Sequence, residues 1–596
     1  MHRINAIAAH FCSTPSSSPV SILQRYLVHD NHELRESITD FLKDDIYRQN
    51  YELSLSEYRE LTLRRIRKFI EARFFSVRDY VENPRKFMAV MEMISLADFS
   101  MGIKTGVHFT LCGGSICRLG TKKHHDAYLD KMDSFELPGS YCMTELGHGS
   151  NVAGLETTAT YDSATREFII HTPSNTASKF WIGGAGLHGK ITVVFAQLSV
   201  SGVSKGVHAF VMRIRDDKMR PMPGVTIKDI GHKMGLNGID NGQLWFNQVR
   251  ISRDALLDRF CSIDDAGGYH SPISNDAQRF GMMIGGLTTG RMLIAQGCID
   301  AMKLGLCIAI RFGADRPQFG EKRVLEYSSY QRAIIPSLAD AYALHIAMGN
   351  LKEIVTGPLD EPLKTKVVHI VSSGLKAAAS WTAIKVLQRC RECCGGLGYH
   401  SSNKIPELIA DTNITATFEG SNPVLMQQVA RALMEQYRDN TGFADNNASV
   451  PLSLSPKHLL YLMNQRENKL VHTALAAQSA KKLRDMALVE IGWANVEKLC
   501  MTWLIKASKR APPEARGLLD KMVLLFGASK VEKKIGFYMG CGLMSHDEGN
   551  AITEMVDNLC EDLCKNDARD ALDLCSAFGI PDHLIQAPIA FDWRKM

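Results

Sequence analysis

The stretch of residues 416–423, with the sequence ATFEGSNP, contains the residues best suited to chemistry in this chain. Glu419 stands in a turn, and Gly420, which has no side chain, leaves room for a ligand to approach it. We expect Asn422 to cap the next helix and Pro423 to take its first position, where no amide donor is needed. A carboxylate held beside a glycine is equipped to remove a proton next to a carbonyl group. Most such glutamates are solvated turn residues, so Glu419 becomes a catalytic candidate only where other motifs agree with it.

The elements around this turn are predicted from hydrophobic periodicity. Apolar residues recur at intervals of three and four in residues 34–96, which predicts helices, and the helical period returns after about residue 275. Between these blocks the period changes to two, and turn residues 162–165 join two of the runs, as in an antiparallel hairpin. The predicted strands are 157–161, 168–171, 191–198 and 207–212; the later helices are 282–312, 325–355, 366–390 and a block from 456 onward, after an Asn- and Asp-rich linker at 443–451.

Residues 184–189 satisfy the GxGxxG pattern of dinucleotide-binding loops. In that fold the loop follows a strand and opens a helix, whose N-terminus receives the pyrophosphate. Here the loop leads into the predicted strand at 191–198. We therefore reject a Rossmann interpretation.

Length and composition indicate a large globular protein. The chain has 596 residues, of which 45% are apolar and 22% charged, and its net charge is +5. This length allows roughly three to five domains. Lysine and arginine are mixed with acidic residues, so no nucleic-acid partner is predicted. No apolar run approaches the roughly 18 residues of a membrane helix, so no membrane span is predicted.

The 15 cysteines have irregular spacing and follow no secretory segment, which favours a reducing compartment. Cys390 and Cys393 form a CxxC pair. A zinc site would need a second ligand pair at suitable spacing, and none is evident. We predict buried or unused thiols and no metal site.

The first 29 residues contain no Asp or Glu, and a Ser- and Pro-rich run at 13–19 follows the first part of them. If residues 3–11 are helical, Arg3 and His10 share one stripe with Ile4 and Phe11 beside them. The pattern resembles the N-terminal peroxisomal targeting signal that a soluble import receptor reads. A mitochondrial presequence is the rival: the missing acids favour it, and the single arginine before Arg25 weakens it. The C-terminal tripeptide lacks the small residue of a peroxisomal C-terminal signal.

With these blocks in place, the chain resembles an acyl-CoA oxidase of the acyl-CoA dehydrogenase superfamily. The most specific motif is YCMTELGHGSN at 141–151, followed by GLETTATY at 154–161. Further matches occur in the family's order: KFWIGG at 179–184, IGHKMG at 230–235, DNG at 240–242, RPQFG at 316–320 and CGGLGY at 394–399. Two departures are Ile182, where many oxidases have proline, and Glu392, where dehydrogenases often have glutamine.

The resemblance implies a mainly α fold with a central β-domain, in an acyl-CoA dehydrogenase-like arrangement with an extra C-terminal helical domain. The central domain is expected to be antiparallel and barrel-like, and the protein to be a homodimer. The predicted segments are 1–30 (targeting segment and linker), 31–138 (N-terminal helical domain), 139–272 (β-domain), 273–442 (helical bundle with the catalytic Glu and the FAD site) and 453–592 (C-terminal helical domain).

The resemblance also implies the reaction, which is the first step of peroxisomal fatty acid β-oxidation. Glu419 is expected to remove the α-proton of a fatty acyl-CoA while the β-hydrogen passes as hydride to N5 of FAD, and O2 then becomes H2O2. The Glu419 backbone amide is expected to polarise the thioester oxygen together with a ribityl hydroxyl of the flavin. Burial is expected to raise the pKa of Glu419 toward the range of a general base.

The residues that this resemblance assigns to the site fall into two groups. The expected FAD contacts are Met143, Thr144, Gly149, Ser150, Trp181, Gly183, Ser421 and Asn422, with Arg316, Gln318, Phe319, Gly396 and Gly398 reaching the FAD of a partner subunit; the expected substrate contacts are Ser150, Arg291 and Gly420. Without the resemblance, Thr144 and Asn422 would be caps, Trp181 a core aromatic and the glycines a helix stop. Arg316 would be a solvated helix end and Arg291 a member of an ion pair.

Two other interpretations stay open at this point. One is a dehydrogenase that passes electrons to a protein acceptor, and the other is a catalytically silent flavoprotein-like scaffold. The GHGS form, the C-terminal helical block and the N-terminal pattern favour an oxidase, and the presence of Glu419 disfavours the scaffold.

Overall fold

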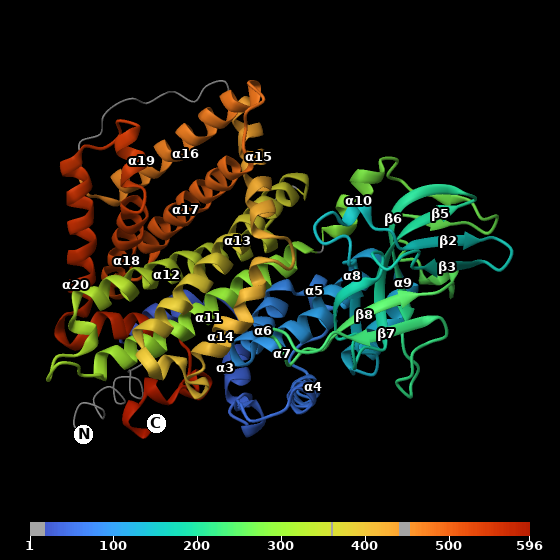
Figure 1. Ribbon diagram of the computed structural model, residues 1–596, viewed down its shortest axis with the longest axis horizontal. Coiled ribbons are helices and arrows are strands. Elements are labelled where there is room, and N and C mark those ends of the chain that lie inside the picture. The colour runs from blue at the N-terminus through green and yellow to red at the C-terminus, as the bar shows by residue number, and fades with distance from the viewer. Residues whose placement is uncertain (1–17, 286, 359–360, 440–452) are drawn as a thin grey trace. The chain divides into compact units, whose positions relative to one another are not determined.

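The computed structural model describes residues 18–285, 287–358, 361–439 and 453–596. These residues form two compact units (Figure 1): one joins the chain up to His32 with Ile294–Met596, and the other is Glu33–Leu293. Each unit is described by itself. The predicted targeting signal at 3–11 and the predicted linker at 443–451 lie outside the described residues, and the predicted domain boundaries stay predictions.

The helices of residues 33–293 begin at the capping residues that their sequence supplies. Ser54 and Glu57 form a reciprocal capping box at the start of α4, and Asn83 and Asp98 accept backbone amides at the starts of α6 and α7. This confirms the helical prediction for 34–96. The helices are α3 (His32–Phe41), α4 (Leu55–Glu71), α5 (Asp79–Glu82), α6 (Pro84–Ala97), α7 (Phe99–Gly106), α8 (Gly114–Leu119), α9 (Lys122–Asp133) and α10 (Asp276–Ile284), with a π-helical segment η2 (Val107–Gly113) between α7 and α8.

A six-stranded sheet and a three-stranded sheet form the β region of this unit. The larger runs β1-β5-β2-β3-β9 with β6 also paired to β5, and the smaller runs β4-β8-β7. The strands are β1 (Gly139–Cys142), β2 (Thr158–Asp162), β3 (Glu167–His171), β4 (Lys179–Gly183), β5 (Ile191–Val200), β6 (Val203–Arg213), β7 (Val225–Asp229), β8 (Asn241–Phe246) and β9 (Val249–Ser252), with a small β10 (Ser262–Ile263) and β11 (Tyr269–His270) pair.

The predicted hairpin is confirmed, since β2 and β3 pair antiparallel with Tyr161 opposite Phe168. The expectation of an antiparallel β-domain is confirmed for most strand pairs and is wrong for β5, which pairs parallel with both β1 and β2. Parallel neighbours need crossover connections, and the long excursion through β3 and β4 supplies one between β2 and β5. The alternating residues of both sheets bury a shared core that includes Phe168, Phe210 and Phe246.

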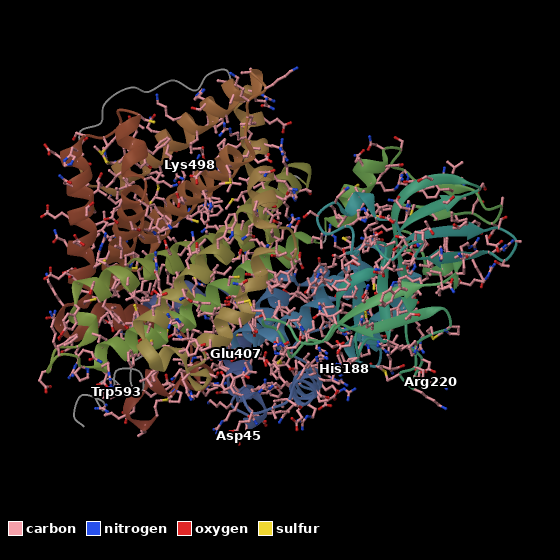
Figure 2. All side chains as sticks on the ribbon, in the orientation of Figure 1. Asp45, His188, Arg220, Glu407, Lys498 and Trp593 are labelled. Carbon is pink, nitrogen blue, oxygen red and sulfur yellow. The ribbon has the colours of Figure 1, made fainter. Side chains whose placement is uncertain are left out.

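The GxGxxG segment is a turn between β4 and β5, so no helix follows it and the rejection of a Rossmann loop is confirmed. Asp240 fixes this turn. Its carboxylate accepts a hydrogen bond from the amide of Leu187 at 2.7 Å and forms an ion pair with Lys104. Burial opposes the charge of Asp240, but Lys104 and His188 (labelled in Figure 2) outweigh it and hold its pKa well below the usual value. Arg215 binds the carbonyls of Gly186 and Gly189 from the other side.

The described residues of the other unit form helices and the loops between them, and no β-strand. Its long helices pack side by side (Figure 1), with α12 against α13 and α13 against α15. They are α11 (Leu287–Asp315), which enters from the other unit, α12 (Ser328–Thr356), α13 (Glu361–Cys393), α14 (Ile405–Asn413), α15 (Asn422–Asp439), α16 (Pro456–Ser479), α17 (Asp485–Arg510), α18 (Pro513–Glu532), α19 (Ile535–Gly540), α20 (His546–Ser576) and α21 (Asp582–Ile585).

Residues 19–28 form a helix of this unit, α2 (Pro19–Val28), so the linker prediction is wrong there. Ser18 caps the helix, and Val20, Leu23 and Leu27 recur at helical spacing and are buried. The hydroxyl of Tyr26 donates to the carbonyl of Ala507 at 2.8 Å. Burial of these three apolar side chains stabilises a helix, although the segment follows a Ser- and Pro-rich run.

Among the residues that the structure describes, one helical stretch, Asp276–Asp315, is long and apolar enough to cross a membrane by length and composition. Its most apolar 18-residue window has a mean hydropathy of 1.7, and 94% of that window is buried inside the protein. Core helices of globular proteins pass the same test.

Candidate functional site

Glu419 lies in a turn between two helical segments, as its sequence predicts. The short 3₁₀ segment η8 (Ile414–Ala416) follows α14, and α15 begins at Asn422. Glu419 has a φ of 56° and Gly420 a φ of 106°, so two consecutive residues are left-handed. A left-handed conformation is costly for a residue with a Cβ and must be held by its surroundings. Strain of this kind, observed at a half-buried carboxylate, is a reason to suspect function.

Asn422 does not cap α15, which corrects the sequence prediction. The carbonyl of Ser421 accepts the amide of Leu425 at 3.0 Å, so Ser421 is the capping residue and Pro423 is the second residue of the helix. The fully buried Asn422 side chain turns instead toward α13, where its Nδ2 donates to the Ser380 hydroxyl at 2.9 Å.

Lys376 of α13 binds the same turn. Its ammonium group is 0% exposed and donates to the Gly420 carbonyl at 2.7 Å and to Asn422 Oδ1 at 3.0 Å. The Ser380 hydroxyl, which receives the Asn422 amide, donates in turn to the Lys376 carbonyl at 2.8 Å. Residues 420–422 are therefore fixed to one helix by a connected set of hydrogen bonds. Lys376 and Ser380 were not identified from the sequence.

A cavity of about 490 Å³ brings three other predicted residues together. It is lined by Arg316, Gln318 and Gly396, and also by Arg389 and Glu392. Two guanidinium groups face one carboxylate in this cavity, so it favours an anionic ligand. Its remaining lining residues are Phe312, Val324, Ser329, Tyr330, Ala333, Cys393, Cys394, Gly395 and Leu397.

The RPQFG motif forms a tight loop beside this cavity. The amide of Gln318 donates to the carbonyl of Lys322 at 2.9 Å, and the Tyr327 hydroxyl donates to the Gln318 carbonyl at 2.9 Å. Phe319 stands at the tip of the loop with a φ of 53° and is 93% exposed. Trp593, labelled in Figure 2, stacks on Arg316 with 3.9 Å between the guanidinium carbon and the ring centroid. This stacking fixes the plane of the guanidinium group.

The glycines of the CGGLGY motif have different physical roles. Gly395 has a φ of 57° and ends α13. Gly396 is exposed, with no atom within 4 Å of the position that a Cβ would take. A Cβ on the buried Gly398 would lie 2.4 Å from the Arg391 carbonyl oxygen. Gly398 is therefore required by packing against the end of α13. A ligand can approach the backbone at Gly396 and also at Gly395, where a Cβ would likewise meet no atom within 4 Å.

In the unit of residues 33–293, the first motif lies at the end of β1. Met143 is 5% exposed, and the Thr144 carbonyl accepts the amide of Phe180 in β4 at 3.0 Å. The buried Lys179 ammonium donates to the Met143 carbonyl at 3.2 Å and to Glu145 Oε1 at 2.9 Å. This ion pair, 0% exposed on both sides, joins the two strands at the point where the motif begins.

Glu145 collects further donors from the GLETTATY segment. Its carboxylate accepts the amides of Glu156 at 2.7 Å and Thr157 at 2.9 Å, and the Thr157 hydroxyl at 2.6 Å. Burial opposes the charge of Glu145, but Lys179 and these donors outweigh it and lower its pKa. The two most specific motifs of the sequence are thus bound to each other through one carboxylate.

Trp181 departs from ordinary strand geometry. Its φ is 67°, β4 carries an irregularity between Lys179 and Ile182, and the indole is 55% exposed. A bulky residue with positive φ is an outlier, so Trp181 is not the core aromatic that its sequence alone would favour. Gly183 is buried, and a Cβ there would lie 3.0 Å from the side chains of Ile239 and Val107.

The other predicted residues of this unit are Gly149, Ser150 and Arg291. Gly149 and Ser150 are exposed in the loop after β1, and a Cβ on Gly149 would meet no atom within 4 Å. Arg291 is buried in α11. Their expected roles at the acyl-CoA stay predictions.

The CxxC pair behaves as the sequence predicts. Cys390 is buried and Cys393 half-buried, both are free thiols, and burial raises the pKa of Cys393 to about 11. Within the described ranges, no group of three or more His, Cys, Asp or Glu side chains is arranged to hold a metal ion.

Family models match this chain in three places. "Acyl-CoA dehydrogenase, middle domain" matches residues 140–249, "Acyl-CoA oxidase, C-alpha1 domain" matches 284–434 and "Acyl-CoA oxidase" matches 456–592. The first match covers most of the β region, including Met143 and Trp181, and the second covers the Glu419 turn and the cavity.

Whole-chain relatives and solved structures agree with these matches. "Acyl-coenzyme A oxidase 2, peroxisomal" of Arabidopsis thaliana is 36% identical over 95% of this chain and 89% of its own length. "Peroxisomal acyl-coenzyme A oxidase 3" of Homo sapiens is 32% identical over 90% of this chain and 84% of its own length. The crystal structure of acyl-CoA oxidase 1 from Yarrowia lipolytica superposes with a TM-score of 0.87 at 26% identity, covering 99% of this chain and 92% of that one. This chain therefore belongs to the acyl-CoA oxidase family of oxidoreductases and has the acyl-CoA dehydrogenase-like fold.

Proposed function

We propose that this protein is an FAD-dependent acyl-CoA oxidase that converts a fatty acyl-CoA and O2 into the trans-2-enoyl-CoA and H2O2, with Glu419 as the base. The observation that carries the proposal is the Glu419 turn, in which two consecutive residues are left-handed and the buried Lys376 ammonium binds Gly420 and Asn422. Family membership and the name of the human relative, a peroxisomal oxidase, support the reaction class.

Glu419 performs the proton transfer in this proposal. The α-proton of a thioester is too weakly acidic for an unaided carboxylate, so the thioester oxygen must be polarised as enolate charge develops. The Glu419 backbone amide is assigned as that donor, and its side chain as the acceptor of the proton. Bound FAD supplies the acceptor for the β-hydrogen, and O2 takes up the electrons. The side chain and the backbone amide of Glu419 are both positioned by the same backbone conformation. This explains why the hydrogen bonds of Lys376 and Asn422 fix the turn.

The residues around the cavity fit the anionic part of FAD. Arg316 is held flat by Trp593, Arg389 adds a second guanidinium group, and Gly396 leaves its backbone open. A planar guanidinium suits paired phosphate oxygens. Glu392 lies in the same cavity, and Gln388 holds it with a hydrogen bond of 2.7 Å to Oε1. We assign Arg316, Gln318 and Gly396 to the FAD diphosphate of a partner subunit, with Phe319 at the same interface, and we propose a homodimer.

The flavin ring contacts are proposed in the unit of residues 33–293. Met143, Thr144, Trp181 and Gly183 belong to adjoining strand ends that Lys179 and Glu145 connect. The exposed, left-handed Trp181 supports this assignment, since its conformation is not needed to fill a core. Gly149, Ser150, Ser421 and Asn422 are kept as further FAD contacts, and Ser150, Arg291 and Gly420 as substrate contacts. Gly398 is withdrawn from the FAD contacts because packing explains it.

We propose the peroxisomal matrix as the location, reached through a soluble import receptor. Support comes from the relatives named peroxisomal and from the pattern of Arg3, Ile4, His10 and Phe11, which lies outside the described residues.

The test is peroxide release from purified protein with saturated acyl-CoAs of increasing chain length. The unaltered protein should release peroxide with a defined chain-length preference. Glu419→Gln should retain FAD and lose about 10²–10⁴-fold in turnover, the usual range for a general base. Glu435→Gln, an exposed glutamate of α15, is the matched control and should keep full activity. Flavin reduction without peroxide on admitting air would indicate a dehydrogenase, and no reduction by any acyl-CoA would indicate a silent scaffold.

A further inference from the structure

Lys376 is a buried cation bound to the turn that carries the proposed base. It is 0% exposed, and its ammonium binds the carbonyl of Gly420, the residue that follows Glu419. It also binds Asn422 Oδ1, so one ammonium group joins two residues of the turn. Burial of a lysine is costly, and an apolar side chain of similar size often serves stability equally well. A cation placed here therefore calls for an explanation beyond packing.

The backbone conformation of the turn supplies that explanation. Glu419 and Gly420 are both left-handed, with φ values of 56° and 106°, and they lie outside helices and strands. The left-handed conformation is costly for Glu419, which has a Cβ, whereas Gly420 adopts it readily, so the Glu419 conformation persists only when the surroundings fix it. In this turn, the Lys376 bond to Gly420 and the paired bonds of Asn422 with Lys376 and Ser380 provide the fixation.

We propose that Lys376 is a positioning residue for proton abstraction: through the Gly420 carbonyl and Asn422 it holds Glu419 in the left-handed conformation that directs both its carboxylate and its backbone amide. The assignment rests on the proposed function of Glu419. Its positive charge also favours negative charge nearby, which develops on the thioester oxygen during the reaction. Ser380 supports the same arrangement at one remove, through Asn422.

The test compares holoenzymes carrying Lys376→Met, Lys376→Arg and Lys385→Met. Lys385 is exposed on the same helix and supplies the matched control. The first readout is kcat and KM for peroxide release. The second is deprotonation of a 3-thiaacyl-CoA, in which sulfur replaces the β-carbon and no hydride can leave; an enolate beside an oxidised flavin is detected as a long-wavelength absorbance band. FAD content is measured in every variant.

We expect Lys376→Met to retain FAD, to lose about 10²-fold in kcat with KM changed less than about threefold, and to form the enolate band weakly. Lys376→Arg keeps the positive charge, so its kcat should be about tenfold higher than that of Lys376→Met. Lys385→Met should have the same kcat and KM as the unaltered protein. Turnover of Lys376→Met within about threefold of the unaltered protein, with Glu419→Gln inactive, would overturn the role of Lys376 and leave the proposed function standing. Normal turnover of Glu419→Gln would overturn the proposed function itself.

A Lys376→Met protein that does not fold is replaced by Ser380→Ala. This change removes the hydroxyl that accepts the Asn422 amide and donates to the Lys376 carbonyl, and it should lower kcat by about 3–10-fold with FAD retained. An unchanged kcat and an unchanged enolate band in Ser380→Ala would then overturn the proposal.

Discussion

Two buried lysines hold the two segments to which the proposed chemistry is assigned, and they act on different kinds of backbone. Lys179 joins Met143 and Glu145 to β4, where the chain is already paired as strands. Lys376 joins α13 to a turn with two left-handed residues outside any helix or strand. The first lysine completes a closed ionic network inside a sheet, whereas the second fixes a conformation that the turn does not favour. Loss of the first should therefore appear mainly in stability, and loss of the second mainly in turnover.

Lys179→Met should give the largest loss of stability. The change leaves the Glu145 carboxylate buried without its cation, and breaking a buried pair in this way costs about 3–5 kcal/mol. Urea unfolding of the holoenzyme measures the loss as a lower midpoint. Lys228→Met, at an exposed lysine of β7, is the control and should leave the midpoint within error. An unchanged midpoint in Lys179→Met would remove the basis of the comparison.

Glu145→Gln should lower stability by about 2–4 kcal/mol at pH 7, somewhat less than Lys179→Met because the lysine left behind is able to lose its proton. Burial opposes the charge of Glu145, but Lys179 and the amide donors lower its pKa from 4.5, so its carboxylate stabilises the folded state above that pH. This contribution is lost as the pH falls below 4.5 toward the folded-state pKa. The difference in unfolding temperature between the unaltered protein and Glu145→Gln should therefore become smaller as the pH falls through that window. A difference that stays constant with pH would contradict the ionic role of Glu145.

Gly420→Ala should have the smallest effect on stability but a clear effect on turnover. Its φ of 106° disfavours a Cβ, and that Cβ would lie 2.9 Å from the Leu425 side chain. We expect a cost of about 1–3 kcal/mol, taken up by a shift of the turn, and a fall in kcat of about tenfold or more. Gly517→Ala, in the open face of α18, is the control and should be neutral. Loss of stability without loss of turnover would place the turn outside the chemistry.

Local sequence signals predicted the elements of both segments. The residues Gly420, Asn422 and Pro423 predicted a turn at Glu419 before α15. The alternation of apolar residues with a period of two predicted β2, β3, β5 and β6 close to their observed bounds. The motifs of the resemblance predicted the family, which whole-chain relatives confirm. These features depend on residues that are near one another in the chain.

The features that the sequence did not predict depend on distant partners. Asn422 is of a residue type that often caps helices. Its side chain is bound by Lys376, 46 residues earlier, and by Ser380, 42 residues earlier, so it does not cap α15. Gly396 and Gly398 are alike in the motif, and only packing against the Arg391 carbonyl distinguishes them. The parallel pairing of β5 is likewise a non-local choice that periodicity does not encode.

The most direct test of the account is flavin absorbance after anaerobic mixing of the holoenzyme with a fatty acyl-CoA that the protein oxidises. The unaltered protein should bleach within the mixing experiment. Glu419→Gln should hold the same amount of FAD and stay oxidised, because no group removes the α-proton. Bleaching of Glu419→Gln at the rate of the unaltered protein would contradict the central claim that Glu419 is the base.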